Sequence, residues 1–154
     1  MTTVAFPTQV ARPKLLRPIL VGGLIAGTLD HICALLSFGI NGSKYIAAAL
    51  FGLQAVRWGT PAIVVGTLLH FSIALSIAAV YCLASRRLPF LREHWLVCGI
   101  FYGIAAYLVM NLVVLPLCAL HLTGPYQYRG LLQGLLVHMF FIGLPISYSL
   151  RKLS

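Results

Sequence analysis

Five polar side chains interrupt the longest apolar stretches of the sequence, and their types suit proton or cation chemistry. They are Asp30, His31, His70, Asn111 and His138. An ionisable group inside hydrocarbon is costly, so such residues are usually paired or functional. Chains of Asp and His form proton relays in pumps and transporters, and a histidine titrates near neutral pH. These residue types therefore suggest proton- or cation-linked transport, provided that the helices bring them together.

Two other interpretations of the same residues stay open. The side chains could form a buried hydrogen-bond network that fixes helix register, since such bonds average under ~1 kcal/mol in membranes and specify more than they stabilise. His70 and His138, which fall at similar depths on two helices, could instead ligate haem or a metal. No further ligand motif accompanies them, so we expect neither a metal nor a bound cofactor. We expect no enzyme activity, because no Ser/His/Asp set, Walker loop or carboxylate pair can be assembled.

Helical spacing places four of these polar side chains on faces that also carry small or aromatic residues. The runs are Gly23, Gly27 and Asp30; Gly66 and His70; Gly134 and His138; and Gly103, Tyr107 and Asn111. Their spacings of i+4, i+7 and i+8 keep each set on one helix face. Small residues mark helix contacts in membranes, so we expect these polar groups to point inward, into one layer. His31 is the exception, because one residue turns a helix by about 100° away from Asp30.

The elements that must position these residues are membrane spans. Of the 154 residues, 60% are apolar and only 8% are charged, whereas globular domains are nearer a quarter charged. Apolar runs of about 20 residues, enough to cross ~30 Å of hydrocarbon, predict an all-α bundle of four transmembrane helices. The spans are expected over 18–39, 61–84, 94–117 and 130–150, in one domain covering 18–152 after a basic tail at 1–17. A further apolar stretch at 43–58 is too short to span and predicts an interfacial helix.

Basic residues set the expected orientation and partner. The larger group, expected on the cytoplasmic side by the positive-inside rule, is Arg12, Lys14, Arg17, Arg86, Arg87, Arg92, Arg151 and Lys152. The smaller group is Lys44, Arg57 and Arg129. Both termini are then cytoplasmic, and Arg86, Arg87 and Arg92 meet the anionic headgroups of the bilayer. The net charge of +9 is not gathered on one face as nucleic-acid binding requires, which excludes that class of partner.

Glycines recur in a pattern that suggests an internal repeat. Gly23-x-x-x-Gly27 recurs 76 residues later as Gly99-x-x-x-Gly103, and Gly66-x-x-x-His70 recurs 68 residues later as Gly134-x-x-x-His138. The pattern predicts a helical hairpin doubled in parallel about an axis along the membrane normal, although glycines also recur in membrane helices by chance. We expect helix packing within the bundle, or else in a homo-oligomer or larger complex, at Gly23, Gly27, Gly66, Gly99, Gly103, Gly130 and Gly134.

Several short motifs resemble the YagU-like family of small bacterial inner-membrane proteins. They are Gly23-Leu-Ile-Ala-Gly27, His70-Phe-Ser-Ile73 leading to Tyr81-Cys82, the Leu88-Pro89 turn, Pro116-Leu117, and Gly134 to His138 near a basic C-terminus. The resemblance covers most of residues 19–152 and implies four spans in a bacterial inner membrane, with no established activity or catalytic residues. The chain departs from the family where the short stretch at 43–58 replaces an extended polar segment, and Asp30 falls on no matching motif.

Three functions follow from these patterns. The leading hypothesis is a small proton- or cation-linked transport or permeation protein that uses the intramembrane Asp/His layer. The alternative is a structural or accessory subunit that packs against a larger complex through its glycine faces. A bis-histidine haem-binding redox protein is the third.

Overall fold

The computed structural model describes residues 14–122 and 127–154, and all regular structure within these ranges is helical. The predicted tail at 1–17 lies outside the described residues except for its last four positions. The elements in chain order are α1 (Leu16–Phe38), α2 (Asn41–Phe51), the 3₁₀ helix η1 (Leu53–Trp58), α3 (Thr60–Ala84), α4 (Phe90–Glu93), α5 (Trp95–Val109), the π-helical η2 (Met110–Val114), α6 (Leu115–Leu117), α7 (Tyr128–Val137), the π-helical η3 (His138–Gly143) and α8 (Leu144–Leu153).

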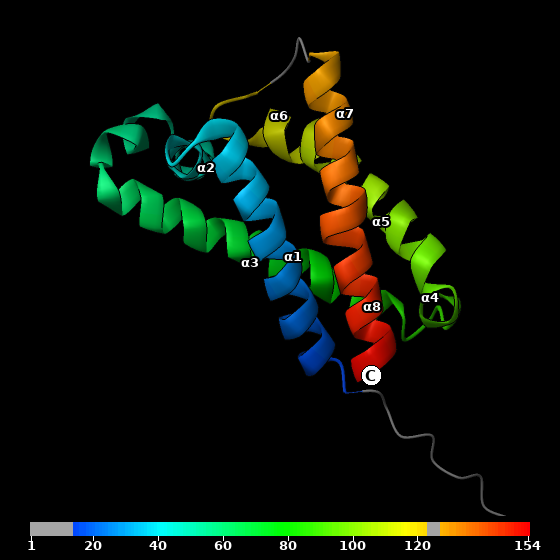
Figure 1. The fold of residues 1–154 in the computed structure, drawn as a ribbon. Helices are drawn as coiled ribbons and strands as arrows, with labels where there is room; N and C mark the ends of the chain where they lie inside the picture. Colours follow the sequence, from blue (N-terminus) through cyan, green and yellow to red (C-terminus); the bar gives the residue numbers. More distant parts are fainter. Residues whose placement is uncertain (1–13, 123–126) are drawn as a thin grey trace, which may run out of the picture.

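Four of the helical stretches are long and apolar enough to cross a membrane. They are Leu16–Phe38, Thr60–Ala84, Trp95–Leu117 and Tyr128–Leu153, and each end lies within three residues of its predicted position. Figure 1 shows α1 beside the continuous helix formed by α7 and α8, with α3 and α5 behind them. The chain is therefore an all-α integral membrane protein with four spans, as its apolar runs predicted.

The segment between the first two spans differs from the single interfacial helix predicted at 43–58. It forms α2 and η1, which are separated at Gly52, where a φ of +84° ends α2 in a conformation that favours glycine. α2 packs against the first half of α3. The contact buries four small side chains completely: Ala47, Ala48, Ala55 and Ala62.

Two π-helical turns interrupt the third and fourth spans. In both spans a Leu-Pro pair follows the π segment directly, with prolines at positions 116 and 145. A proline has no N–H, and its ring clashes with the carbonyl four residues earlier, so a wider turn before it relieves the clash. The structure shows a π turn before each proline, and the third span ends at Leu117.

Glycine contacts support the predicted internal repeat. In each hairpin, two glycines of the first helix face two residues of the second helix. Those two residues lie one and five positions after the histidine of the second helix. The contacts are Gly27 with Phe71, Gly23 with Leu75, Gly103 with Met139, and Gly99 with Gly143. The shifts of 76 and 68 residues that relate the sequence motifs therefore also relate these contacts.

The largest buried cluster lies between the two hairpins, near the ends of α3 and α8. Gly22 of α1 lies directly against Ile146 and Ser149 of α8, so these two helices approach closely. Close approach at small residues is how membrane helices gain van der Waals contact without a hydrophobic driving force. The cluster consists of Leu15, Ala26, Ala78, Tyr81, Cys82, Ile142, Ile146 and Leu150.

Candidate functional site

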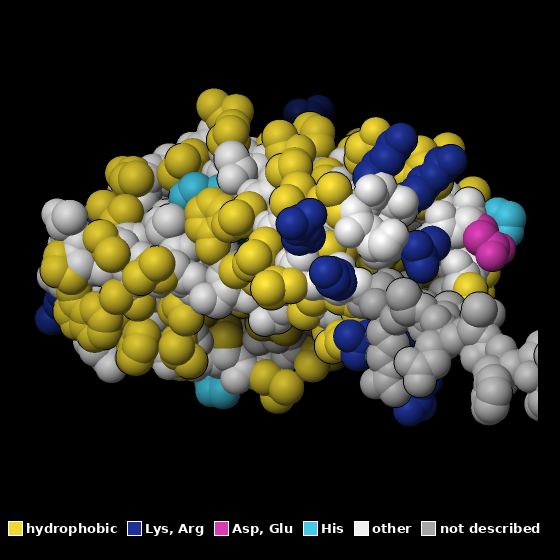
Figure 2. All heavy atoms as spheres, turned by 90° about the horizontal axis from the view of Figure 1, so that it is seen from below, with side chains coloured by type: hydrophobic (Ala, Val, Ile, Leu, Met, Phe, Trp, Pro, Cys, Tyr) yellow, Lys and Arg dark blue, Asp and Glu magenta, His cyan; other side chains and the backbone are white. Residues whose placement is uncertain are grey.

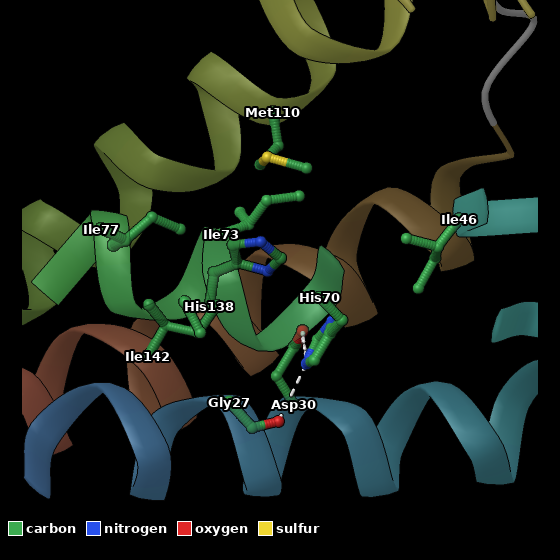
Figure 3. A pocket seen from close by; sticks show the side chains of 10 residues that line it. Gly27, Asp30, Ile46, His70, Ile73, Ile77, Met110, His138 and Ile142 are labelled. Carbon is green, nitrogen blue, oxygen red and sulfur yellow. Dashed lines mark hydrogen bonds and ion pairs between the residues drawn. The ribbon is translucent and has the colours of Figure 1, made fainter. Parts of the chain in front are cut away.

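A cavity of about 90 Å³ lies inside the bundle, where side chains from all four spans meet. Asp30 of α1, His70 of α3 and His138 at the start of η3 face this cavity (Figure 3). The volume is sufficient for a few water molecules. The other lining residues carry no side-chain charge: Gly27, Ile46, Ile73, Ala74, Ile77, Met110 and Ile142. The structure therefore brings together three of the five polar residues that the sequence singled out.

His70 is held by two oxygens of α1. Its Nε2 lies 2.9 Å from the carbonyl oxygen of Gly27 and 3.8 Å from Oδ2 of Asp30. A carbonyl oxygen only accepts, so Nε2 carries the hydrogen and donates it to Gly27, which leaves Nδ1 of the neutral ring as an acceptor. Gly27 and Asp30 are three residues apart on one helix, so α1 presents a backbone acceptor and a carboxylate to the same ring.

His138 is held by its own helix. Its Nδ1 lies 2.9 Å from the carbonyl oxygen of Gly134, one turn earlier, and its ring meets the edge of Tyr107 with centroids 5.3 Å apart. By the same argument Nδ1 donates, and Nε2 of the neutral ring is the acceptor. His70 and His138 are equivalent in the internal repeat. Each therefore has one ring nitrogen committed to a helix carbonyl and one able to take a proton.

Asp30 breaks the symmetry of this arrangement. The residue 76 positions later is Ala106, so the second hairpin has no carboxylate at the equivalent place. Asp30 and Glu93 are the two acidic residues of the whole chain, and Glu93 lies at the end of α4, outside the spans. The side chain of Asp30 is 20% exposed and that of His70 is 12% exposed. The cavity thus combines two similar histidines with a single carboxyl group.

His31 lies next to the cavity residues without lining the cavity. Its ring centroid is 4.8 Å from that of His70, and its Nδ1 is buried without a hydrogen-bond partner among the described residues. The helical spacing predicted that His31 points away from the Asp30 face, so its contact with His70 was not expected. The spacing does contain the signal, because Gly23, Gly27 and His31 follow i, i+4, i+8 and so share the helix face that meets α3.

The structure does not place Asn111 among the residues that line the cavity. Its side-chain amide donates a hydrogen bond to the carbonyl of Tyr107, one turn earlier in the same span. An unbroken α-helix would place Asn111 on the face of Gly103 and Tyr107, but the helix becomes π-helical at Met110. Met110 lines the cavity instead.

The predicted packing glycines have different neighbours. Gly66 faces the backbone of α2, where it contacts the carbonyl of Ser43, and Gly134 faces the ring of Tyr107 on α5. Gly130 makes no close contact within the bundle, since nothing in the described structure lies within 4 Å of the place where its Cβ would stand. The remaining members of the set join the two helices of a hairpin, as described above.

Basic side chains cover the end of the molecule that carries the C-terminal residues of α8 (Figure 2). Arg86 and Arg87 are exposed in the turn after α3. Arg92, which the sequence analysis grouped with them, donates a hydrogen bond to the carbonyl oxygen of Ser154 at 3.1 Å. The guanidinium of Arg92 therefore links α4 to the end of α8.

The cavity does not fit haem. Pockets for small organic ligands measure roughly 300–1,000 Å³, several times the 90 Å³ found here. Within residues 14–122 and 127–154, no group of three or more His, Cys, Asp or Glu side chains is arranged to hold a metal ion.

Comparison with known proteins adds no further constraint on the site. No protein-family profile, curated protein or solved structure matches the chain. The resemblance to the YagU-like family stays a prediction from short motifs.

Proposed function

We propose that the chain is a small proton-linked membrane transport protein in which Asp30, His70 and His138 hold and pass protons. The observation that carries this proposal is their convergence, from three different spans, on one water-sized cavity. A charged side chain at the centre of a membrane helix costs about 2.5–3.5 kcal/mol or more. A chain whose spans are otherwise apolar gains little fold stability from such residues, which supports a function for them.

The hydrogen bonds give His70 the form of a relay. A proton taken from water at Nδ1 makes the ring an imidazolium, and loss of the Nε2 proton to Asp30 restores a neutral ring. The carboxylate at 3.8 Å attracts the imidazolium by about 4 kcal/mol at an effective dielectric constant of ~20. His138 can accept a proton at Nε2 in the same way, so water in the cavity would connect two acceptors and one carboxylate.

Proton flux in liposomes tests this proposal. The purified protein is reconstituted with a pH-sensitive dye inside, and a potassium gradient with valinomycin sets the membrane potential. We expect dye acidification that Asp30→Asn slows by about tenfold or more, equal to a barrier increase of about 1.4 kcal/mol. His94→Gln, at an exposed histidine between α4 and α5, is the matched control and should leave the flux unchanged. Equal flux in wild type, Asp30→Asn and empty liposomes would overturn the proposal.

The alternative function, an accessory subunit, has less support. A partner that docks through glycine faces needs those faces to be open, yet of the seven glycines assigned to packing only Gly130 faces open space. An accessory subunit would co-purify with a larger complex and tolerate Asp30→Asn. The same flux assay, combined with size measurement of the complex in mild detergent, therefore separates the two functions.

We also propose a bacterial inner membrane with both termini in the cytoplasm. The bundle brings the starts of α1 and α5 to the same end as the ends of α3 and α8. Arg151, near the end of α8, lies 5.6 Å above the ring of Trp95 at the start of α5. Basic residues concentrated at one end follow the positive-inside rule. A C-terminal fusion to a reporter that is active only in the cytoplasm tests this orientation, and an inactive fusion would overturn it.

A further inference from the structure

A second hollow, separate from the polar cavity, opens between α3 and α5 near the basic end of the molecule. Its volume is about 520 Å³, and the residues that line it are apolar. Five lining side chains are between 43% and 67% exposed: Val80, Leu88, Phe90, Val97 and Phe101. We call this hollow the α3–α5 groove.

The internal repeat explains why the groove exists. Cys98 and Tyr102 of α5 stand where the first hairpin has Gly22 and Ala26, and Tyr81 of α3 stands where the second has Ser149. α1 and α8 therefore meet at small residues and pack closely, whereas α3 and α5 do not. The rings of Tyr81 and Tyr102 lie between them instead, with centroids 4.7 Å apart. Two bulky residues at positions that are small in the other half of the repeat hold the helices apart.

The two tyrosines add no unpaired polar group to the groove. The hydroxyl of Tyr81 donates to the carbonyl of Leu91 at 3.0 Å, and that of Tyr102 donates to the carbonyl of Ile77 at 2.6 Å. With both hydroxyls committed to the backbone, the rings offer apolar surface. An apolar hollow between two membrane spans is in contact with lipid, and filling it with hydrocarbon recovers dispersion contacts that an empty gap forfeits.

Two basic residues directly precede the groove in the chain. Arg86 and Arg87 are exposed and immediately precede Leu88, which lines it. Arg92 donates a hydrogen bond to Ser154. Among the described residues, Arg86 and Arg87 are the arginines of this loop that make no such bond. Glu93, the acidic residue at this end, lies at the end of α4, beyond Phe90 and Leu91. Adjacent cations above an apolar slot match a phospholipid with a negative headgroup.

We propose that the α3–α5 groove binds one anionic phospholipid, with an acyl chain between Tyr102 and Phe101 and the headgroup against Arg86 and Arg87. The bound lipid replaces the close helix contact that the two tyrosines prevent. This site is independent of the proton pathway, because it shares no lining residue with the polar cavity.

Native mass spectrometry tests the proposal on the full chain. The protein is exchanged into detergent micelles doped with phosphatidylglycerol or with phosphatidylcholine of the same acyl chains, and the bound lipid is counted. We expect one phosphatidylglycerol per chain and weaker retention of phosphatidylcholine. Each basic side chain near a membrane surface contributes about fivefold in affinity, so Arg86→Gln with Arg87→Gln should weaken phosphatidylglycerol binding by about thirtyfold.

Two further variants test the contribution of the groove separately from that of the arginines. Ala105→Trp places a ring where an exposed alanine lines the groove and should remove the bound lipid. Leu108→Trp adds an indole at an exposed position of the same helix outside the groove and should retain it. Equal retention of the two lipids by the wild-type chain would overturn the proposal without any variant. Retention by Ala105→Trp equal to that of Leu108→Trp would overturn the groove as the binding site.

Discussion

Replacing Gly66 with alanine measures how closely α2 and α3 are packed. The new methyl group would overlap the carbonyl of Ser43 and approach the amide nitrogen of Ala47 at 3.3 Å. Both groups belong to the α2 backbone, so no side chain can rotate away and α2 must move as a body. Such overpacking costs about 3 kcal/mol at the upper end of the usual range. The better helix propensity of alanine recovers about 1 kcal/mol, which leaves a net loss of about 2 kcal/mol.

Gly130→Ala is the matched control, because the same substitution there meets nothing within 4 Å. It should raise the free energy of unfolding by up to about 1 kcal/mol through helix propensity alone. The two variants should therefore differ by about 3 kcal/mol. Equilibrium unfolding in mixed micelles of SDS and a mild detergent, followed by circular dichroism, measures both. Unfolding free energies within about 0.5 kcal/mol of each other, the ordinary scatter of surface substitutions, would refute the close contact between α2 and α3.

The remaining predictions concern the cavity and the tyrosine pair. Tyr102→Phe removes the hydroxyl bonded to the carbonyl of Ile77 and should lower the free energy of unfolding by about 1 kcal/mol in the same titration; Tyr45→Phe, at an exposed ring, should have no effect. His70→Gln with His138→Gln should slow the proton flux by about tenfold or more, because both rings line the cavity with Asp30; flux equal to that of the wild type would contradict the relay. The purified protein should show no Soret band, since a 90 Å³ cavity does not hold haem; a band lost in His138→Ala would reverse that conclusion.

Hydropathy was sufficient to predict the spans, because crossing a bilayer imposes length and composition on each helix. The predicted third span at 94–117 and the observed Trp95–Leu117 differ by one residue at one end. The glycine spacing also predicted which helix faces make contact, since close approach at Gly27 and Gly103 requires a missing side chain. These features depend on residue type and period alone.

The rest depended on local backbone geometry that a regular helical period does not contain. The i+8 spacing from Gly103 predicted that Asn111 reaches the cavity. The π turn at Met110 changes which side chain points there, and Met110 lines the cavity instead. Gly52 divides a segment whose apolar composition suggested one continuous helix. The prolines that follow both π segments were visible in the sequence, but a proline in a membrane helix permits a kink, an end or a wide turn.

The glycine contacts also bear on the order in which the chain assembles during synthesis. Every paired contact of Gly23, Gly27, Gly99 and Gly103 lies within its own hairpin. The glycine contacts of the amino-terminal hairpin can therefore form without any residue of the second hairpin. The polar cavity, which needs His138 from the last span, closes only when the second hairpin joins the first. Until that step the carboxylate of Asp30 has His70 as its partner, so the half-built protein is not left with an isolated charge in lipid.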